Sequence, residues 1–329
     1  MKKTILGKNL EVSAVGLGCM GFTHAYGTAM DEKEAARAIA EAVDMGYTYF
    51  DTAECYTGTC ADGSTAYNED LVGEALKPYR DRVVIASKCG VHHNAEGKLV
   101  MDSRPETIRN SVEVSLKRLQ TDHIDLYYQH RIDPKIPAEE VAGVMADLMK
   151  EGKILHWGIS ETTEEYLRKA HAVCPVTCVQ NRYSMMARWH GALFPALEEL
   201  GVGYVAFSPL ANGVLSGAFG KGSKFEEGDF RNKMPQYTDE AMDANRKLMD
   251  YIQALAEEKQ ATPAQISLAW MICKKPYIVP IPGSRKVERI RENAGAADIE
   301  LTAQEVASID EKLDHMEMSG VFGGSAVQK

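Results

Sequence analysis

The stretch Tyr47-Thr48-Tyr49-Phe50-Asp51-Thr52-Ala53-Glu54-Cys55-Tyr56 decides how the rest of the chain is read. Its aromatic and β-branched residues predict a buried strand that ends at Asp51, and Tyr56 follows after the chain has turned. Such a strand brings a carboxylate and a phenol to one rim of a sheet. A tyrosine with a pKa of roughly 10 is a poor acid–base catalyst at neutral pH, so it needs a cation beside it, and that cation needs a counter-charge.

The same arrangement, a short apolar strand that ends at a rim, recurs along the whole chain. Eight strand candidates end at Met20, Asp51, Lys88, His130, Ser160, Gln180, Ser208 and Gly283. Helical patterns fill the intervals, with start signals at Asp31/Glu34, Ser103/Glu106, Thr162/Glu165, Thr262/Gln265 and Thr302/Glu305. Eight alternating units predict an α/β fold, a closed (β/α)8 TIM barrel, with an N-terminal β-hairpin over residues 3–12. An open doubly wound sheet is the alternative, but no Gly-x-Gly-x-x-Gly follows the first strand.

The composition is that of a globular protein with a large core. The chain has 329 residues, 45% of them hydrophobic and 26% charged, and no linker divides it, which predicts one domain over residues 1–329. Lys and Arg number 37 against 47 Asp and Glu, a net charge of -10, and no basic stripe occurs, so we expect no nucleic-acid partner. Neither a signal-peptide pattern nor an apolar run of roughly 18 residues is present, which predicts a cytoplasmic protein with no membrane span.

The seven cysteines form no Cys-x-x-Cys pair, and without an export signal they are interpreted as reduced thiols. Several of them follow strand ends, so a zinc site is the alternative. Zinc sites favour short ligand pairs, and the sequence therefore predicts no metal. The residues that would have to converge on zinc are Cys19, Cys55, Cys60, Cys89, His92 and His93.

Two long segments without a helical or strand pattern follow predicted strands. Residues 57–68 come directly after Tyr56, and residues 213–237 are rich in glycine and charge. A loop as long as the second one inside a compact domain is typical of a lid or a binding loop. The tail at 317–329 contains glycine and either is disordered or folds over the barrel mouth.

The candidate chemistry lies at three consecutive predicted strand ends. Asp51 ends the second strand, Lys88 the third and His130 the fourth, and Tyr56 lies in the loop after the second. Neighbouring parallel strands are about 4.8 Å apart, so their end residues can share one pocket. We expect Asp51 to pair with Lys88 and Lys88 to lower the pKa of Tyr56. Tyr56 then donates a proton to a substrate oxygen that His130 orients. Each residue alone fits a rim salt bridge or a packing role, but their joint placement favours catalysis.

These residues resemble the motifs of the aldo-keto reductase family, in a branch similar to pyridoxal reductases and channel β-subunits. The resemblance covers nearly the whole chain. It rests on Phe50-Asp51-Thr52-Ala53-Glu54-Cys55-Tyr56, Ser87-Lys88, Gln129-His130, Gly158-Ile159-Ser160-Glu161, Phe207-Ser208-Pro209-Leu210 and Ile281-Pro282-Gly283-Ser284-Arg285, in the family's order. It implies an oxidoreductase of the alcohol dehydrogenase type, in which NADPH reduces an aldehyde or ketone to an alcohol and Tyr56 is the general acid.

The resemblance also implies which residues hold the cofactor. Ser160 and Gln180 match positions that hydrogen-bond the nicotinamide carboxamide, and Phe207 matches an aromatic position that stacks on the nicotinamide. Ser284 and Arg285 match positions that bind the adenosine 2′-phosphate in the family. A basic cluster at a helix start suits a phosphate, which favours NADPH over NADH. The implied cofactor-binding set is Met20, Asp51, Ser160, Gln180, Phe207, Ser208, Pro209, Leu210, Gly213, Ser284, Arg285, Arg289, Glu292 and Asn293.

Three positions vary within the family pattern. Gly283 stands where some relatives have lysine, so phosphate binding depends on Arg285 and Arg289. Glu161 stands where many relatives have asparagine. The histidine at position 130 favours carbonyl reduction over the double-bond reduction of relatives with glutamate there.

Two other functions are alternatives. Lys88 could form a Schiff base in an aldolase-like reaction, although Asp51 would raise the lysine pKa rather than lower it. The chain could also hold NADPH as a redox-sensing module with little turnover. The sequence leaves the oligomeric state open and suggests only an apolar or aromatic small-molecule carbonyl as substrate. The candidate pocket residues are Met20, Phe22, Tyr26, His92, His93 and Trp189.

Overall fold

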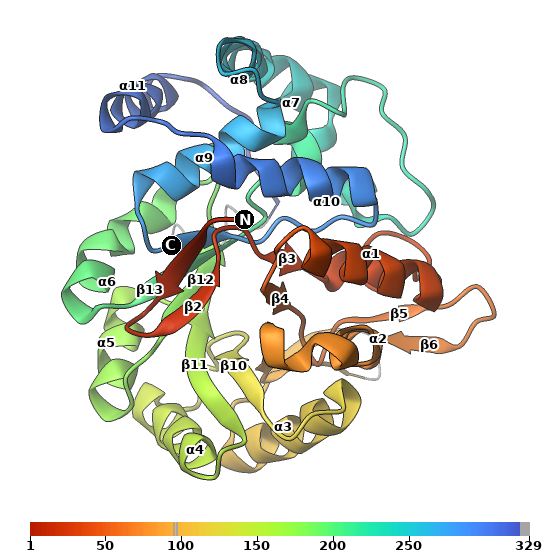
Figure 1. Cartoon of the computed structure of the whole chain (residues 1–329), viewed down its shortest axis with the longest axis vertical. Helices are drawn as coiled ribbons and strands as arrows, with labels where there is room; N and C mark the ends of the chain where they lie inside the picture. The colour runs from red at the N-terminus through yellow and green to blue at the C-terminus, as the bar shows by residue number, and fades with distance from the viewer. Residues whose placement is uncertain (95, 97, 323–329) are drawn as a thin grey trace.

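In the computed structural model, which describes residues 1–94, 96 and 98–322, eight parallel strands curl into a barrel (Figure 1). They are neighbours in the order β14-β13-β12-β11-β10-β7-β4-β3. Their bounds are β3 (Leu17–Gly18), β4 (Tyr49–Asp51), β7 (Val84–Cys89), β10 (Ile124–Gln129), β11 (Ile154–Ser160), β12 (Cys178–Arg182), β13 (Gly203–Phe207) and β14 (Ile278–Pro280). The eight predicted strands and the predicted barrel class are confirmed.

The first and last strands meet along a seam where the two backbones approach closely. The N–H of Gly16 donates to the carbonyl oxygen of Pro280 at 3.0 Å, and the N–H of Gly18 donates to that of Pro282 at 3.4 Å. A Cβ atom on Gly283 would lie only 2.6 Å from the carbonyl oxygen of Gly18. In this chain the backbone at position 283 therefore leaves no room for a side chain unless the seam shifts.

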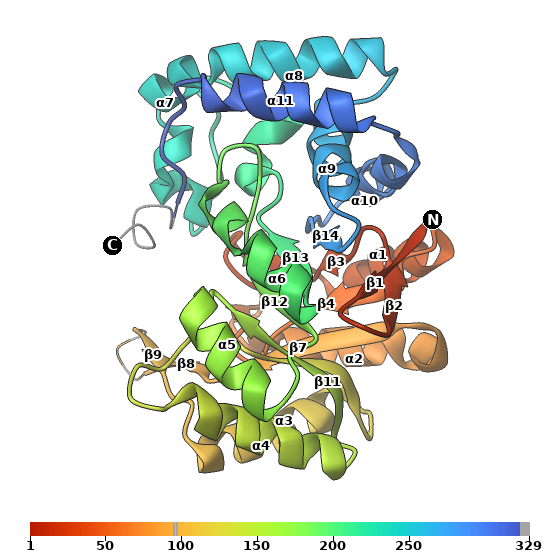
Figure 2. The same ribbon diagram turned by 90° about the vertical axis from the view of Figure 1, so that its left-hand side faces the viewer.

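Helices surround the strands on the outside. Their bounds are α1 (Glu32–Asp44), α2 (Asn68–Leu76), α3 (Pro105–Leu119), α4 (Ala138–Lys150), α5 (Glu164–Val173), α6 (Phe194–Leu200), α7 (Asp239–Ala244), α8 (Arg246–Glu258), α9 (Pro263–Lys274), α10 (Val287–Ala294) and α11 (Ala303–Asp314). The interval between β13 and β14 is the longest of the barrel and holds two helices, α7 and α8, in addition to α9. Helices α8 and α11 both pack on the outside of α9 (Figure 2). Among the described residues, none of the helices combines the length and apolar character needed to cross a bilayer.

Most of the predicted helix starts are confirmed. The side chains that accept backbone N–H groups in the first turn are those of Asp31, Thr262 and Thr302. Two predicted caps are wrong. Helix α5 is capped by Thr163, whose side chain accepts the backbone N–H of Tyr166, whereas the Thr162 hydroxyl donates to the carbonyl oxygen of Thr163 at 3.2 Å. Helix α3 has no side-chain cap, since Ser103 is buried and its hydroxyl accepts a hydrogen bond from Gln129.

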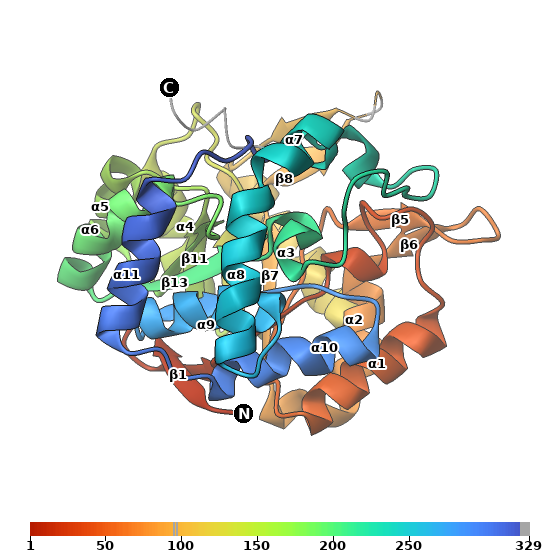
Figure 3. The same ribbon diagram turned by 90° about the horizontal axis from the view of Figure 1, so that it is seen from above.

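The predicted N-terminal hairpin closes one end of the barrel. It consists of β1 (Lys3–Leu6) and β2 (Leu10–Ser13) in antiparallel pairing. Its apolar side chains Leu6, Leu10 and Val12 pack into the barrel interior, where they form a small core with inward side chains of the strands. A larger core lies between the strands and the helices. Figure 3 shows the N-terminus at one end of the molecule and α7 and β8 (Val91–His93) at the other. Functional side chains can therefore gather only at the end away from the hairpin.

The two long segments that follow predicted strands differ in how much regular secondary structure they contain. Residues 57–68 are not irregular as predicted, because β5 (Thr57–Thr59) and β6 (Thr65–Tyr67) form a hairpin that leads into α2. Residues 213–237 contain only short 310 turns, and they are tied to the loop after β3. The N–H of Phe230 donates to the carbonyl oxygen of Ala25 at 2.8 Å.

The described part of the C-terminal tail packs on the same long segment. The N–H of Phe322 donates to the side-chain oxygen of Gln236 at 2.9 Å, and the rings of Phe322 and Phe230 meet edge to face at 5.0 Å. The prediction for residues 323–329 lies outside the described residues.

Candidate active site

The alternation of side chains along the strands directs the candidate catalytic groups to one place. The interior core contains the inward side chains Tyr49, Ala86, Tyr128, Cys178 and Val205. Two residues further along the same strands come Asp51, Lys88, His130, Gln180 and Phe207. Because side chains two apart in a strand share a face, all five point into the barrel at its open end.

Lys88 is at the centre of this group. Its side chain is fully buried, and its ammonium nitrogen lies 2.5 Å from Oδ1 of Asp51 and 2.7 Å from the carbonyl oxygen of Thr52. The Tyr56 hydroxyl lies 3.5 Å from the same nitrogen. Burial acts to lower the pKa of Lys88, but Asp51 and Tyr56 outweigh it, so the pKa is raised and the lysine stays charged. The expected contacts of Lys88 with Asp51 and Tyr56 are present.

The carboxylate of Asp51 is held from both sides. Its Oδ2 accepts a hydrogen bond from Nε2 of Gln180 at 2.7 Å, and the Tyr49 hydroxyl lies 3.4 Å away. Asp51 is 3% exposed, so these bonds and Lys88 replace nearly all of its contact with water. Gln180, predicted to bind the cofactor, therefore also positions the carboxylate.

The expected pKa of Tyr56 needs a correction. Lys88 does act to lower it, as predicted, but removal of the phenol from water has the larger, opposite effect and Asp51 adds to the rise, so the pKa is about 12. The prediction of a phenol more acidic than usual is wrong. Tyr56 is instead a phenol that stays protonated at neutral pH, with a cation in place to stabilise its anion.

Two histidines flank the Tyr56 ring. His130 meets it edge-on with ring centroids 5.6 Å apart, and His24 stacks on it at 5.8 Å. Burial lowers the pKa of His130 well below its usual range, so the imidazole is neutral at neutral pH, and its Nδ1 lies 3.5 Å from Sγ of Cys55. Nδ1 of His24 lies 2.7 Å from the carbonyl oxygen of Thr57, which fixes this nitrogen as the donor.

The residues implied for the nicotinamide lie on the adjoining strand ends. The Ser160 hydroxyl accepts a hydrogen bond from Nη1 of Arg131 at 3.2 Å. The Phe207 ring carries the guanidinium of Arg182 at 4.9 Å from its centroid. In the segment that follows Phe207, positive φ angles occur at Ser208 (49°), Ala211 (49°), Asn212 (59°) and Gly213 (111°). Such alternating backbone turns direct N–H groups toward an anion.

The residues implied for the adenosine end lie just before α10 and along it. Nε of Arg285 donates to the carbonyl oxygen of Gly21 at 2.5 Å, whereas its Nη2 is buried and has no partner among the described residues. Arg289 and Glu292 pair with each other at 2.5 Å, and Asn293 is 4% exposed. The Nη2 nitrogen of Arg285 is therefore a buried hydrogen-bond donor that a ligand with an acceptor atom would satisfy.

The predicted substrate-pocket residues are only partly brought together. Phe22 is 1% exposed and belongs to the core between strands and helices, so its assignment to the pocket is wrong. The His93 ring lies 6.1 Å from that of His24, which places β8 beside Tyr56. The indole nitrogen of Trp189 is buried without a partner among the described residues.

The sequence analysis missed three polar residues of this end of the barrel: His24, Arg131 and Arg182. The period of two could have found Arg182, because it follows the inward Gln180 by two residues in β12. No local signal marks His24, which reaches Tyr56 only through the folding of the loop after β3.

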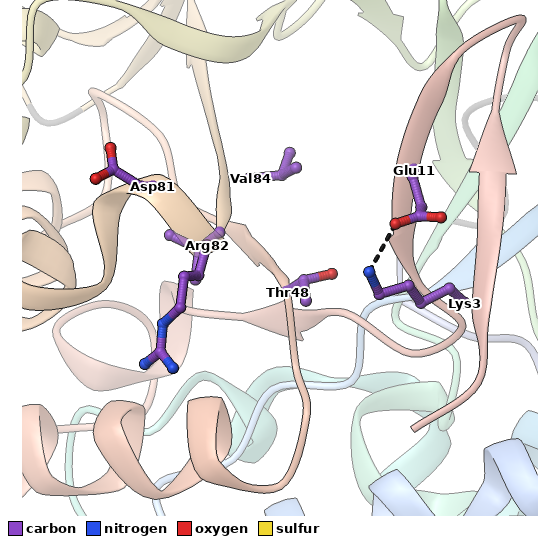
Figure 4. Close-up of a pocket in the computed structure, with 7 residues that line it drawn as sticks. Lys3, Glu11, Thr48, Asp81, Arg82 and Val84 are labelled. Carbon is purple, nitrogen blue, oxygen red and sulfur yellow. Dashed lines mark hydrogen bonds and ion pairs between the residues drawn. The ribbon is translucent and has the colours of Figure 1, made fainter.

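A surface hollow of about 410 Å³ lies at the other end of the barrel (Figure 4). It is lined by Lys3, Glu11, Thr48, Asp81, Arg82, Val83 and Val84, between the hairpin and the starts of β4 and β7. In TIM barrels that end supports stability, whereas the carboxyl end of the strands carries the chemistry. The hollow is therefore no part of the candidate site.

A TIM barrel with a buried ion pair, a phenol and a neutral imidazole at the carboxyl end of its strands defines a barrel enzyme. The chain belongs to the aldo-keto reductases: the model of the Aldo/keto reductase family matches residues 14–314. It is 36% identical over 315 residues to the probable aldo-keto reductase 1 of Glycine max, covering 95% of this chain and 89% of that protein.

Solved structures agree with this assignment. The glycerol dehydrogenase AKR11B4 of Gluconobacter oxydans superposes with a TM-score of 0.84 at 26% identity, covering 95% of both chains. The holo form of the aldo-keto reductase AKR11C1 of Bacillus halodurans gives a TM-score of 0.74 at 28% identity, covering 95% of this chain and 96% of that one. Membership implies reduction of small-molecule carbonyls with a nicotinamide cofactor.

Proposed function

We propose that this chain reduces aldehydes or ketones to alcohols with NADPH, and that Asp51, Tyr56, Lys88 and His130 are its catalytic residues. The observation that carries the proposal is the buried ammonium of Lys88, 2.5 Å from Asp51 Oδ1 and 3.5 Å from the Tyr56 hydroxyl. When bound, the nicotinamide supplies a hydride to the carbonyl carbon. The chain has to supply the proton for the carbonyl oxygen.

Tyr56 is suited to supply that proton. Its pKa of about 12 keeps it protonated at neutral pH, and an alkoxide is a far stronger base than a phenolate, so the proton moves from the phenol to the substrate oxygen. The phenolate left behind lies next to the Lys88 ammonium, which Asp51 keeps charged. His130 is neutral and can donate a ring N–H to the same oxygen, which orients the carbonyl.

The residues of the chain also fit the cofactor. The buried, unpartnered Nη2 of Arg285 calls for an acceptor such as the 2′-phosphate of NADPH, and Ser284 precedes it at the start of α10. The turns after Phe207 suit the pyrophosphate. The proposed cofactor contacts are those implied by the family resemblance: Met20, Asp51, Ser160, Gln180, Phe207, Ser208, Pro209, Leu210, Gly213, Ser284, Arg285, Arg289, Glu292 and Asn293.

The decisive test is Tyr56→Phe, which removes only the hydroxyl. NADPH oxidation with a reactive aldehyde should fall by roughly 10²- to 10⁴-fold, the usual contribution of a general acid, while the Kd for NADPH stays unchanged. Tyr251→Phe, on the outer helix α8, is the matched control and should keep full activity. Undiminished turnover of Tyr56→Phe would reject the proposed mechanism. Slow turnover of every carbonyl by the wild type, with tight NADPH binding, would instead favour the redox-sensing module.

The cofactor preference has a separate test in Arg285→Leu. Loss of a charge-assisted hydrogen bond of about 1.5–3 kcal/mol should weaken NADPH binding by roughly 10- to 150-fold and leave NADH binding unchanged. Arg291→Leu removes a charge from the exposed side of the same helix and is the control. Equal weakening of both cofactors by Arg285→Leu would contradict recognition of the 2′-phosphate.

A further inference from the structure

Arg182 is a buried cation at the mouth of the barrel that the proposed mechanism does not use. It ends β12, one inward position beyond Gln180, and only 8% of its surface is exposed. Its guanidinium lies over the Phe207 ring at 4.9 Å from the centroid. The Arg182 charge therefore lies beside the residue proposed to support the nicotinamide.

This cation has no matching anion in the part of the chain that the structure describes. No carboxylate oxygen there lies within 4.0 Å of the Arg182 guanidinium, and none of the side-chain hydrogen bonds involves it. The carboxylate of Glu161, whose charge acts on Arg182, accepts the backbone N–H of Arg182 through Oε1 at 3.3 Å and forms no ion pair with the guanidinium. The guanidinium nitrogens of Arg182 are not among the enclosed polar atoms without a partner, so they reach the open end of the barrel. A largely buried cation whose donors stay accessible there suits a ligand that brings a negative charge.

A second arginine lies at the same end of the barrel, after β10, with β11 between it and β12. Arg131 follows His130, and its Nη1 donates to the carbonyl oxygen of His130 at 3.1 Å and to the Ser160 hydroxyl at 3.2 Å. In the described residues it also forms no ion pair. Burial lowers the pKa of Arg182, the charge of Glu161 acts to raise it and the charge of Arg131 acts to lower it further. An excess of positive charge at this point stands out in a chain of net charge -10.

We propose that Arg182, assisted by Arg131, binds a carboxylate or phosphate group of the carbonyl substrate and makes the enzyme selective for anionic aldehydes and ketones. The proposal rests on the proposed reductase function and adds the class of its substrate. A planar guanidinium binds such oxyanions through two parallel hydrogen bonds. The phosphates of the cofactor carry the same chemistry, so the test has to separate substrate binding from cofactor binding.

The kinetic test compares 4-carboxybenzaldehyde with 4-methylbenzaldehyde, which differ in charge at one end of the same ring. The wild type should favour the carboxylate by at least roughly tenfold in kcat/KM. Arg182→Met should lower kcat/KM for the carboxylate by roughly 10- to 100-fold, mainly through KM, and change the methyl compound by less than roughly threefold. Arg131→Met should act in the same direction with a smaller loss. Arg109→Met, on the outer face of α3, is the control for loss of a positive charge.

A binding measurement completes the test without turnover. In isothermal titration calorimetry, 4-carboxybenzyl alcohol should bind the wild type with NADP⁺ at least roughly tenfold more tightly than 4-methylbenzyl alcohol, and Arg182→Met should lose that difference. Arg182→Lys keeps the positive charge but loses the planar guanidinium, so it should retain part of the preference for 4-carboxybenzyl alcohol. This variant replaces Arg182→Met in the test if the methionine variant does not fold.

Two results would overturn the proposal. One is equal binding and equal kcat/KM for the charged and neutral compounds in the wild type. The other is a weaker Kd for NADPH in Arg182→Met with the carboxylate preference intact, which would assign the arginine to the cofactor. Absence of NADPH oxidation with either aldehyde would count against the reductase function itself, and the calorimetric comparison would then decide the role of Arg182 alone.

Discussion

Lys88→Met is the substitution that bears most directly on the centre of the site. It removes the ammonium but keeps the apolar length of the side chain, and it leaves Asp51, 3% exposed, without its cation. Loss of one partner of a buried ion pair costs about 3–5 kcal/mol, because the other charge is left in a medium of low dielectric constant. The hydrogen bond from Gln180 to Asp51 remains, so we expect a loss near the lower limit, about 3 kcal/mol of the free energy of unfolding at pH 7.

A double-mutant cycle isolates the interaction of the two charges. Asp51→Asn keeps one acceptor oxygen, which can stay with Lys88, and its NH2 group then faces Gln180, whose amide can turn to accept, so its cost should be smaller, about 2 kcal/mol. The double variant Asp51→Asn/Lys88→Met buries no charge and should also cost about 2 kcal/mol, rather than the sum of the single losses. The coupling free energy between positions 51 and 88 is then about 3 kcal/mol.

Urea unfolding followed by circular dichroism measures these free energies, provided that the slope with urea is the same in all four proteins. The raised pKa of Lys88 determines the pH range over which the coupling free energy should stay constant. A base whose pKa is raised on folding contributes stability below its unfolded pKa of roughly 10.4, and loses it as the pH rises through the folded value. The coupling should therefore be constant between pH 7 and about pH 10. A coupling below about 0.5 kcal/mol at pH 7 would refute the reasoning, since it would mean that water screens the pair.

Two further predictions concern other parts of the molecule. Because burial lowers the pKa of His130 well below its usual 6.5, the unfolded chain binds a proton there first, and stability should fall below about pH 6.5 by up to about 1.4 kcal/mol per pH unit. His130→Asn should remove the contribution of His130 to this loss of stability, as measured by urea unfolding at several acid pH values. An unchanged dependence of the unfolding free energy on pH would contradict the prediction. At the barrel seam, Gly283→Ala places a Cβ atom 2.6 Å from the carbonyl oxygen of Gly18 and should cost about 1–3 kcal/mol. Gly143→Ala in α4 meets no atom within 4 Å and should instead stabilise by about 0.5–1 kcal/mol; equal effects of the two substitutions in thermal unfolding would refute the crowding argument.

The strands and their order could be predicted from the sequence because each is a short apolar run that ends at a rim. A closed barrel makes β3 and β14 neighbours, but the close approach of their backbones could not be predicted. Gly18 and Gly283 lie far apart in the chain, and only the closed barrel brings their backbones together. The two wrong helix caps have a similar cause. Ser103 and Thr162 carry suitable side chains at suitable spacing, but the Ser103 hydroxyl accepts a hydrogen bond from Gln129. Asn181 binds the backbone N–H of Thr162, and the Thr162 hydroxyl donates to the carbonyl oxygen of Thr163.

The contacts of the candidate site could be predicted where they depend on strand ends. Asp51, Lys88 and Tyr56 meet as expected, because neighbouring parallel strands bring their ends together. The raised pKa of Tyr56 could not be predicted from the sequence, since the depth to which the phenol is buried depends on loops that come from several parts of the chain. Arg182 was missed because the apolar run before it ends at Val179. Pairing with Phe207 of β13 extends the strand beyond that point.

The charges at the barrel mouth are better explained by function than by stability. Replacement of a buried ion pair by neutral groups is often close to neutral, or stabilising by about 1–4 kcal/mol, so Asp51 and Lys88 contribute little that apolar side chains could not supply. The double variant Asp51→Asn/Lys88→Met, at a cost of about 2 kcal/mol, should stay folded and yet lose NADPH oxidation. A phenol of pKa about 12 has no cation to stabilise its anion once Lys88 is gone. Arg182 follows the same reasoning: a guanidinium over the Phe207 ring that forms no ion pair with the described residues adds little to stability, and the proposed anionic substrate brings the missing negative charge.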